Sequence, residues 1–418
     1  MDIFSYLLGR KYKDSNTGSG SGANITSNIK IVDNKSSVLT SSHNKLCIVN
    51  DTGDLSFKVV DKIDGGTEEL STLSEVLPQG LQSSCCATFG NNIYIFGGAG
   101  SNGVTNTIYK FNCITKTTET LSVTLPNTLS SACCSAYEDN IYIFGGYSGG
   151  YSNTIHKFNC KTETIETLTT TLPYKITSSC CSTYEDNIYI FGGYNYIDGN
   201  NFFSNIYKFN CKTNTIFTVS KSLPKALRLA CCATCGDNIY IFGGSTINSK
   251  LNTIYKFNCP SETIETLSIT LPKALAEHSC SLYNDTIYIF GGSYSNTIFK
   301  FNCTNETIET LSVILPSYLT NFCCSTYNGN IYIFGGYTSG YLNSILDFSI
   351  TFNLDLNNVL LYCANSKYNF GLITDQVNIP IKNVYIGDSN NTAQLANAYL
   401  YDETKSAWVN VNTGEALN

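Results

Sequence analysis

The sequence predicts an all-β fold: a six-bladed β-propeller whose last blade is closed by an N-terminal strand, followed by a small β module. Two observations carry this prediction. The tract Ile-Tyr-Ile-Phe-Gly-Gly occurs six times, and its glycine pairs lie 48, 47, 51, 48 and 44 residues apart. A period of this size marks an array of supersecondary units that cannot bury their apolar faces alone. The six units also share one order of short apolar runs and turns.

Each unit contains four strand-forming segments, as the unit that ends at Pro173 illustrates. Its strands are a small apolar run, a β-branched and aromatic run ended by Gly-Gly, a third apolar run and an alternating outer segment, at residues 132–137, 141–144, 153–160 and 165–172. Turn-forming Asp, Asn and Thr separate them. Four short antiparallel strands with tight connections make one propeller blade.

The two ends of the array predict how the ring closes. The sixth unit has its third strand near residues 343–348 and then lacks the usual Thr-Ile-Glu-Thr-Leu…Leu-Pro segment. An equivalent segment stands before the first unit, at residues 67–78. We therefore expect residues 67–77 to supply the outer strand of the last blade, which would seal the ring.

This pattern resembles the kelch repeat family, in which a strand ends in Gly-Gly and the repeat spans about 50 residues. The resemblance covers residues 67–350. Two features differ from the family: the outer strands carry Glu-Thr-Leu in place of a Trp, and an Arg precedes the inner strand only at Arg228. The resemblance implies a propeller that binds partners on one rim.

The regions outside the array differ in composition. We expect a head and a flexible Ser/Gly linker in residues 1–40, a β-hairpin segment in 41–66, the propeller in 67–351 and a small β-rich module in 352–418. Short strands of this last module are expected at residues 359–362, 370–374, 384–386, 398–401 and 407–411. The flanks resemble tail-associated proteins of bacteriophages or prophages, which implies a head that docks to a virion and a propeller that displays a receptor-binding rim.

Charge and hydrophobicity exclude several classes of function. The formal net charge is −7 and only 14% of residues are charged, which argues against nucleic-acid binding. No apolar run approaches the roughly 20 residues of a membrane helix, so we expect no membrane insertion. At the start, Asp2 precedes a brief apolar patch and the bases follow it, the reverse of a secretory signal. We expect cytoplasmic synthesis without a signal peptide, with the virion as destination if the phage resemblance holds.

The chain has 19 cysteines, and most recur at fixed places in the repeat, such as the doublet Cys133-Cys134 and the single Cys160. Neighbours on a strand point to opposite faces, so we expect free thiols that pack as small hydrophobes in a reducing compartment. Regular disulfides or a metal site are the alternatives. Cys232 and Cys235 spell one C-x-x-C, which is weak evidence for zinc because no second pair accompanies it. No metal or other cofactor is expected.

The titratable residues do not predict catalysis. Of the three histidines, His43 precedes the array, His156 replaces a tyrosine of the sister strands, and His278 lies in a connection where we expect exposure. The chain has too few arginines for the carboxylate clamp of sialidase-like propellers. Repeated acids are expected as solvated edge charges, at Glu163, Glu166, Glu262 and Glu265. A sugar-acting propeller enzyme is therefore the least favoured option.

A binding site is expected on the rim that carries the connections after Gly-Gly and the links between blades, because these segments vary most. Tyr with Asn and Ser makes an adaptable contact surface, and aromatic faces with amides also suit sugar rings. The expected ligand-binding residues are Tyr147, Tyr151, Tyr194, Tyr196, Phe202, Phe203, Arg228, His278, Tyr294, Tyr318, Tyr337 and Tyr341. The alternative is that tyrosine, with 29 copies, is simply abundant. The expected partner is a host surface glycan or protein, or else a protein partner of an intracellular kelch scaffold.

Overall fold

A computed structural model describes most of the chain. The described residues are 57–59, 67–197, 201–351, 359–362, 370–372, 385–387, 393–395, 398–402 and 407–410. Every regular element among them is a β-strand. Contacts divide the chain into two compact units, with Glu68–Ser349 forming one of them and the flanking segments forming the other.

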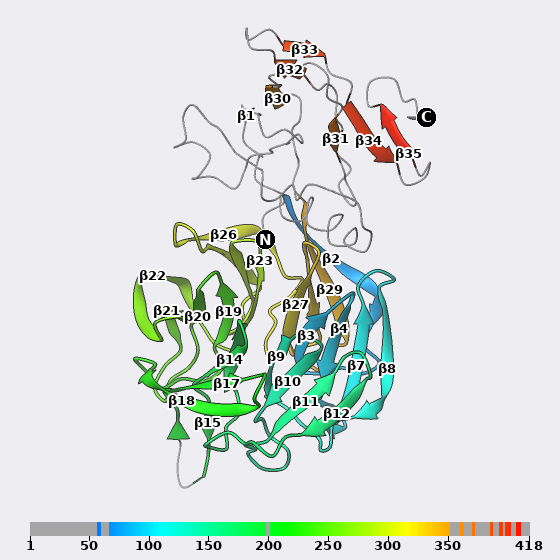
Figure 1. The fold of residues 1–418 in the computed structure, drawn as a ribbon. Coiled ribbons are helices and arrows are strands. Elements are labelled where there is room, and N and C mark those ends of the chain that lie inside the picture. Colours follow the sequence, from blue (N-terminus) through cyan, green and yellow to red (C-terminus); the bar gives the residue numbers. More distant parts are fainter. Residues whose placement is uncertain are drawn as a thin grey trace. The chain divides into compact units, whose positions relative to one another are not determined.

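Glu68–Ser349 contains six four-stranded antiparallel sheets, which are the blades (Figure 1). Blade 1 consists of β3 (Cys85–Phe89), β4 (Asn92–Phe96), β7 (Thr107–Asn112) and β8 (Thr117–Thr124). Blade 2 consists of β9 (Cys133–Tyr137), β10 (Asn140–Phe144), β11 (Ile155–Asn159) and β12 (Thr164–Thr167). Blade 3 consists of β13 (Cys180–Tyr184), β14 (Asn187–Phe191), β17 (Asn205–Asn210) and β18 (Thr215–Ser222).

Blade 4 consists of β19 (Cys231–Cys235), β20 (Asn238–Phe242), β21 (Leu251–Asn258) and β22 (Thr263–Leu275). Blade 5 consists of β23 (Ser279–Tyr283), β24 (Thr286–Phe290), β25 (Thr297–Asn302) and β26 (Thr307–Ile314). Blade 6 joins β27 (Cys323–Tyr327), β28 (Asn330–Phe334) and β29 (Ser344–Thr351) to β2 (Thr67–Val76). Short hairpins extend two rim loops: β5 (Ala99–Gly100) with β6 (Gly103–Val104), and β15 (Tyr194–Asn195) with β16 (Asn201–Phe202).

The closure predicted from the sequence is confirmed. β2 lies beside β29 as the outer strand of blade 6, although 267 residues separate the end of one from the start of the other. The amide of Leu77 donates to the carbonyl of Asn343 at 2.8 Å, and the amide of Leu81 donates to that of Leu342 at 2.9 Å. The inner strands β27 and β3 are also in contact, so the ring has no open seam.

Aromatic side chains join each blade to the next. The repeated Tyr of the second strand packs on the Phe of the next blade's third strand, as Tyr142 does on Phe209 at a ring-centroid distance of 5.1 Å. The same contact occurs at all six junctions, at 4.9 to 5.2 Å. These rings are buried, and tilted aromatic pairs at this spacing are favourable beyond their area. The motif Ile-Tyr-Ile-Phe is therefore the core of the propeller.

The Gly-Gly pair is the backbone joint between blades. The second glycine donates its N–H to a carbonyl in the next blade's link, as in Gly146 to Ile176 at 2.8 Å. All six pairs make this bond, at 2.7 to 2.9 Å. At Gly145, φ is +62° and a Cβ would lie 2.4 Å from the Ile176 oxygen. Only glycine combines that conformation with that approach.

A second ring of backbone hydrogen bonds surrounds the channel entrance; we call it the collar. One residue from each interblade link donates its N–H to the equivalent carbonyl of the preceding blade, at 2.6 to 3.0 Å. Its members all have φ between +53° and +63°: Ser83, Ser131, Ser178, Leu229, Glu277 and Asn321. Such strain persists where the surrounding structure fixes the backbone. Here the six bonds form a closed circle.

The repeated acids are not all solvated edge charges, which corrects one expectation. Glu163 and Glu262 lie in the turn before the outer strand and accept from a lysine of the preceding blade, Lys110 and Lys208, each at 2.8 Å. They are half-buried and join neighbouring blades. Equivalent pairs join blades 4 and 5 and blades 5 and 6, at Lys256–Glu306 and Lys300–Glu68. Glu166 and Glu265, by contrast, are exposed on outer strands, as expected.

The junction between blades 6 and 1 carries this ion pair with its charges exchanged. Lys116 takes the turn position of the glutamates, and Asp347 takes the third-strand position of the lysines. Their N–O distance is 2.6 Å. Asp347 is buried and also accepts from the side chain of Asn330 at 2.6 Å.

The inner strands surround a central channel with a cavity volume of about 470 Å³, and cysteines line much of it. The seventeen cysteines that the structure describes are free, which agrees with the expected packing role. Members of a doublet contact different neighbours: Cys133 is hydrogen-bonded to Cys181 of blade 3, whereas Cys134 is hydrogen-bonded to Cys85 of blade 1. Burial raises the pKa of most of these thiols, including Cys134, so they stay protonated and behave as small hydrophobes.

Short strands also occur in the flanks. β1 (Phe57–Val59) pairs with β30 (Val359–Tyr362), whose other neighbour is β32 (Tyr385–Gly387), followed in the sheet by β33 (Ala393–Leu395). A second sheet contains β31 (Phe370–Leu372), β34 (Ala398–Asp402) and β35 (Ala407–Asn410). The expected C-terminal strands are therefore present. The head, the linker and most of the predicted hairpin lie outside the described residues, and the proposed domain boundaries stay predictions.

Candidate functional site

The loops after Gly-Gly are fastened to the interblade links by paired backbone hydrogen bonds. Arg228 donates its N–H to the carbonyl of Ser245 at 3.0 Å, and Ser245 donates back to Arg228 at 2.8 Å. The same bridge joins Thr177 to Tyr194 in blade 3. Because this pairing recurs around the ring, the variable side chains project from a rigid rim rather than from free loops.

Arg228 lies in a pocket of about 320 Å³ between the loops of blades 3 and 4. Its guanidinium carbon lies 4.4 Å from the centroid of Tyr194 and 5.4 Å from that of Phe202, which are stacking distances for a cation on an aromatic face. The described lining also includes Ser245, Thr246, Ile247, Asn248, Ser249 and Lys250. None of these described lining residues is acidic, so the pocket combines two cations with several hydroxyl and amide groups.

The two cations of this pocket are not neutralised within the described part of the chain. Neither Arg228 nor Lys250 forms an ion pair with a described residue, whereas lysines of the blades' third strands do. The buried Nε of Arg228 has no hydrogen-bond acceptor among the described groups. A guanidinium without an acidic partner favours an anionic ligand group, because a carboxylate or phosphate accepts from its N–H groups in a two-pronged geometry.

The structure brings five of the expected site residues into one series. Tyr147 packs edge-on against Tyr151 at 5.5 Å, and Tyr151 packs against Tyr194 at 6.0 Å. Tyr194 packs against Phe202 at 5.1 Å, and Arg228 covers both rings. This series, which we call the aromatic rim, crosses the loops of blades 2 and 3 and the link between blades 3 and 4.

Other expected residues form separate groups on the same rim. Tyr294 packs on Tyr318 at 5.7 Å, and Lys250 lies 5.7 Å over the Tyr294 ring, which links this pair to the Arg228 pocket. Tyr337 packs on Tyr341 in blade 6, away from that pocket in the ring order. Tyr196 is exposed at the tip of the longest loop.

Two expected site residues pack inward, one partly and one fully buried. Phe203 packs against Tyr174 at 5.3 Å and against the apolar cluster between blades 2 and 3, so its main role is structural. His278 is only 6% exposed, which contradicts the expected exposure. It lines the channel, and its side chain occupies the space next to Gly243 and Gly292. Burial lowers its pKa to about 4, so the ring is neutral.

His156 is buried in its tyrosine position, and its Nδ1 is hydrogen-bonded to Thr167 at 2.9 Å, which confirms a packing role. Sequence reasoning omitted Lys250 and Ile247 from the site residues. Both lie in the variable loop after Gly244, and their place in that loop is the sequence feature that could have identified them. Neither residue type stood out among the aromatics.

Exposed apolar side chains gather on this rim. Eight of the twelve large hydrophobic residues that are exposed in the described chain lie in its loops and links: Tyr147, Tyr174, Tyr196, Ile197, Ile247, Tyr294, Tyr318 and Tyr341. The opposite rim and the outer strands share the other four. Gathering of exposed aromatics on one face marks an interaction surface.

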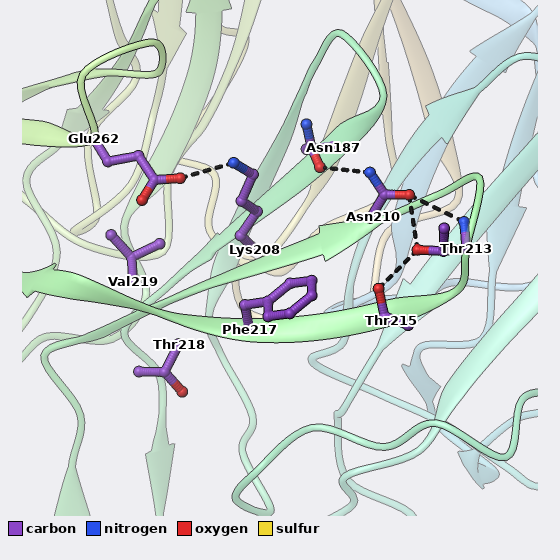
Figure 2. Close-up of a pocket in the computed structure, with 9 residues that line it drawn as sticks. All are labelled: Asn187, Lys208, Asn210, Thr213, Thr215, Phe217, Thr218, Val219 and Glu262. Carbon is purple, nitrogen blue, oxygen red and sulfur yellow. Dashed lines mark hydrogen bonds and ion pairs between the residues drawn. The ribbon is translucent and has the colours of Figure 1, made fainter.

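A second concavity of about 600 Å³ lies at the outer side of blades 3 and 4, next to the exposed ring of Phe217 (Figure 2). Its polar groups bond to one another: Lys208 donates to Glu262 at 2.8 Å, and Asn210 donates to Asn187 at 3.0 Å. Because these groups already have partners, this concavity offers a ligand less than the Arg228 pocket does.

Within the residues described, no three His, Cys, Asp or Glu side chains are grouped in a way that could hold a metal ion. No helix in the described part has the length and apolar character needed to cross a membrane.

Comparison with family models agrees with the geometry. Residues 62–250 match the model described as Attractin/LZTR1 beta-propeller, and residues 232–417 match the KLHDC2/KLHL20/DRC7 Kelch-repeats domain. A search among curated proteins gave no match. With its six blades, Gly-Gly joints and closing strand, the chain is a kelch-repeat β-propeller protein. Kelch propellers typically bind proteins and are generally non-catalytic scaffolds, so a protein-binding role is indicated.

Proposed function

We propose that the protein binds a partner protein through the aromatic rim, and that the Arg228 pocket receives an acidic side chain of that partner. The observation that carries this proposal is Arg228, which has no ion-pair partner among the described residues and stacks on Tyr194 beside Lys250, in a pocket whose described lining has no acid. Exposed Tyr196 and Tyr294 on either side would supply apolar contact area.

Charge and aromatic area play different parts in such an interface. Buried aromatic anchors supply most of the affinity, while a desolvated Arg–carboxylate pair fixes the register of the partner. Losing Arg228 would then leave a buried acid unpaired, which typically costs 2–5 kcal/mol of binding free energy.

The test uses a random peptide display library selected against the full-length protein. Selected peptides should carry Asp or Glu at one fixed position beside apolar residues. They should lose binding to Arg228→Ala and Tyr294→Ala, and should retain it with Phe217→Ala, another exposed aromatic that lies away from the rim. Selection without acidic enrichment, or binding that Phe217→Ala abolishes, would contradict the proposal.

The biological setting is a separate proposal. Following the phage resemblance, we propose that the propeller is carried on a virion, where the rim would bind a host surface glycan or protein; an intracellular kelch scaffold is the alternative. Exposed tyrosines near asparagines support the glycan version, since sugar rings stack on aromatic faces. A glycan array probed with the native protein and with Tyr196→Ala tests it, and binding that this substitution leaves unchanged would refute it.

A further inference from the structure

One thiol pair outside the rim departs from the sixfold pattern. Cys235 ends β19, where the sister strands end in Phe89, Tyr137, Tyr184, Tyr283 and Tyr327. In four sister junctions this aromatic residue packs in the same apolar cluster as the cysteine that follows the next blade's third strand. At the junction of blades 4 and 5, that cysteine is Cys303, and its neighbour is Cys235. Two thiols therefore meet where other junctions have a ring and a thiol.

The two thiols are neighbours across this junction. They lie in the same apolar cluster, and each is the other's side-chain partner in shifting its pKa. The Cys303 amide donates to the carbonyl of Asp285 at 2.8 Å, which fixes the backbone on the blade 5 side. Backbone pairing of Cys235 with Asn238 fixes it on the blade 4 side. These backbone bonds fix the two strand ends that carry the thiols.

We propose that Cys235 and Cys303 form an oxidisable dithiol that a small hydroperoxide converts to a disulfide between blades 4 and 5. Cys235 does not pair with Cys232, the other cysteine of the C-x-x-C sequence, because Cys232 interacts with Cys180 in the channel. Cys303 is partly exposed and Cys235 is buried, so a small oxidant suits the site better than a protein disulfide does.

Oxidation of the pair by a hydroperoxide takes two steps. The Cys235 thiolate attacks the peroxide oxygen, the O–O bond breaks, and the sulfur becomes a sulfenic acid while hydroxide leaves and takes up a proton. The sulfur of Cys303 then attacks the sulfenic sulfur, and its thiol proton leaves with the hydroxyl group as water. Two thiols and one hydroperoxide give one disulfide, one water and one water or alcohol.

The electrostatics support this order of events. The hydrogen bond from Cys303 lowers the pKa of Cys235, although burial opposes it. The same bond and burial raise the pKa of Cys303, and the charge of Asp285 acts in the same direction. A thiol pair whose pKa values are pushed apart has one sulfur suited to attack first.

The test treats the reduced full-length protein with one equivalent of hydrogen peroxide, blocks remaining thiols with N-ethylmaleimide, and maps disulfides by non-reducing peptide mass spectrometry. We expect a cross-linked peptide containing Cys235 and Cys303, with loss of both alkylation adducts in most molecules. Cys235→Tyr restores the sister residue, so it should fold and give no such peptide. Adding Tyr184→Cys to Cys235→Tyr moves the pair to the preceding junction, where a link to Cys259 is expected.

Other results would overturn the proposal. Links confined to the channel thiols, such as Cys133 with Cys181, would show that the repeated pairs oxidise in preference. Full alkylation of Cys235 and Cys303 after peroxide would show that the pair is inert. A peptide that persists in Cys235→Tyr would show that Cys303 has another partner.

Discussion

Exchanging the two charges at the junction of blades 6 and 1 tests whether the reversed ion pair specifies ring closure. Lys116→Glu would place a second carboxylate beside Asp347, which is buried and 2.6 Å from the lysine nitrogen. Asp347→Lys would place two amines together. The double variant restores the lysine–glutamate arrangement of four other junctions, and Glu163, Glu262 and Glu306 occupy that turn position with φ near +51° to +53°.

The expected loss of unfolding free energy depends on how deeply each partner of the ion pair is buried. Removing one member of a fully buried pair costs 3–5 kcal/mol, whereas an exposed pair contributes at most about 1 kcal/mol. The Asp347 side chain is 5% exposed but that of Lys116 is 44% exposed, so the cost falls between these limits. We expect each single variant to lose about 2–3 kcal/mol of unfolding free energy, and the double variant to recover about half or more.

The assay is urea unfolding followed by far-ultraviolet circular dichroism at low salt, where screening is weak. The matched control is the same cycle at Lys161 and Asp139, which lie 2.7 Å apart but are both exposed; their coupling should stay below about 1 kcal/mol. A double variant no more stable than the worse single variant would refute the reasoning, because position rather than charge pairing would then decide stability.

Three further predictions concern stability. Asn214 stands where other junctions have glutamate, so Asn214→Glu should pair with Lys157 and raise the urea midpoint by the equivalent of about 0.5 kcal/mol; no rise would show that the lysine cannot reach it. Folding lowers the pKa of His278 from 6.5 to about 4. Its contribution to the free energy of unfolding is therefore fully present above pH 6.5 and is lost between pH 6.5 and 4, because the unfolded chain binds the proton first. Unfolding at pH 7.5 and 5 should differ by about 2 kcal/mol more in the native protein than in His278→Ala, and equal differences would exclude this role. Gly145→Ala should cost about 2 kcal/mol or more in the same assay, whereas Gly149→Ala, with positive φ but open space, should cost less; equal losses would show that φ alone decides.

Much of the fold could be predicted from the sequence because its signals are local or periodic. The apolar run before each Gly-Gly fixes a buried strand, and the missing outer segment after Phe348 revealed the closing strand before Leu77. The joints between blades could not be predicted in the same way. The Gly-Gly tract marks where such a joint lies, but the acceptor of Gly146, the carbonyl of Ile176, and the bonds of the collar join backbone groups that no side-chain pattern identifies.

The candidate site was predictable in location but not in composition. Variable loops indicated the rim, yet only the structure shows that Arg228 stacks on Tyr194. His278 was misplaced because a polar residue in a connection is normally exposed, whereas this connection turns inward at the channel. Glu163 was interpreted as a solvated charge because its partner, Lys110, belongs to another blade.

The closing strand also determines on which side of blade 6 the chain enters and leaves the propeller. The end of β2 meets the start of β29, so these strands run in opposite directions and the chain enters at Thr67 and leaves near Thr351 on the same side of blade 6. That side is opposite the loops that follow Gly-Gly. Thr67 and Thr351 therefore lie across blade 6 from the rim that carries Arg228, so a fluorescent probe at either residue would report on the propeller without replacing a rim side chain.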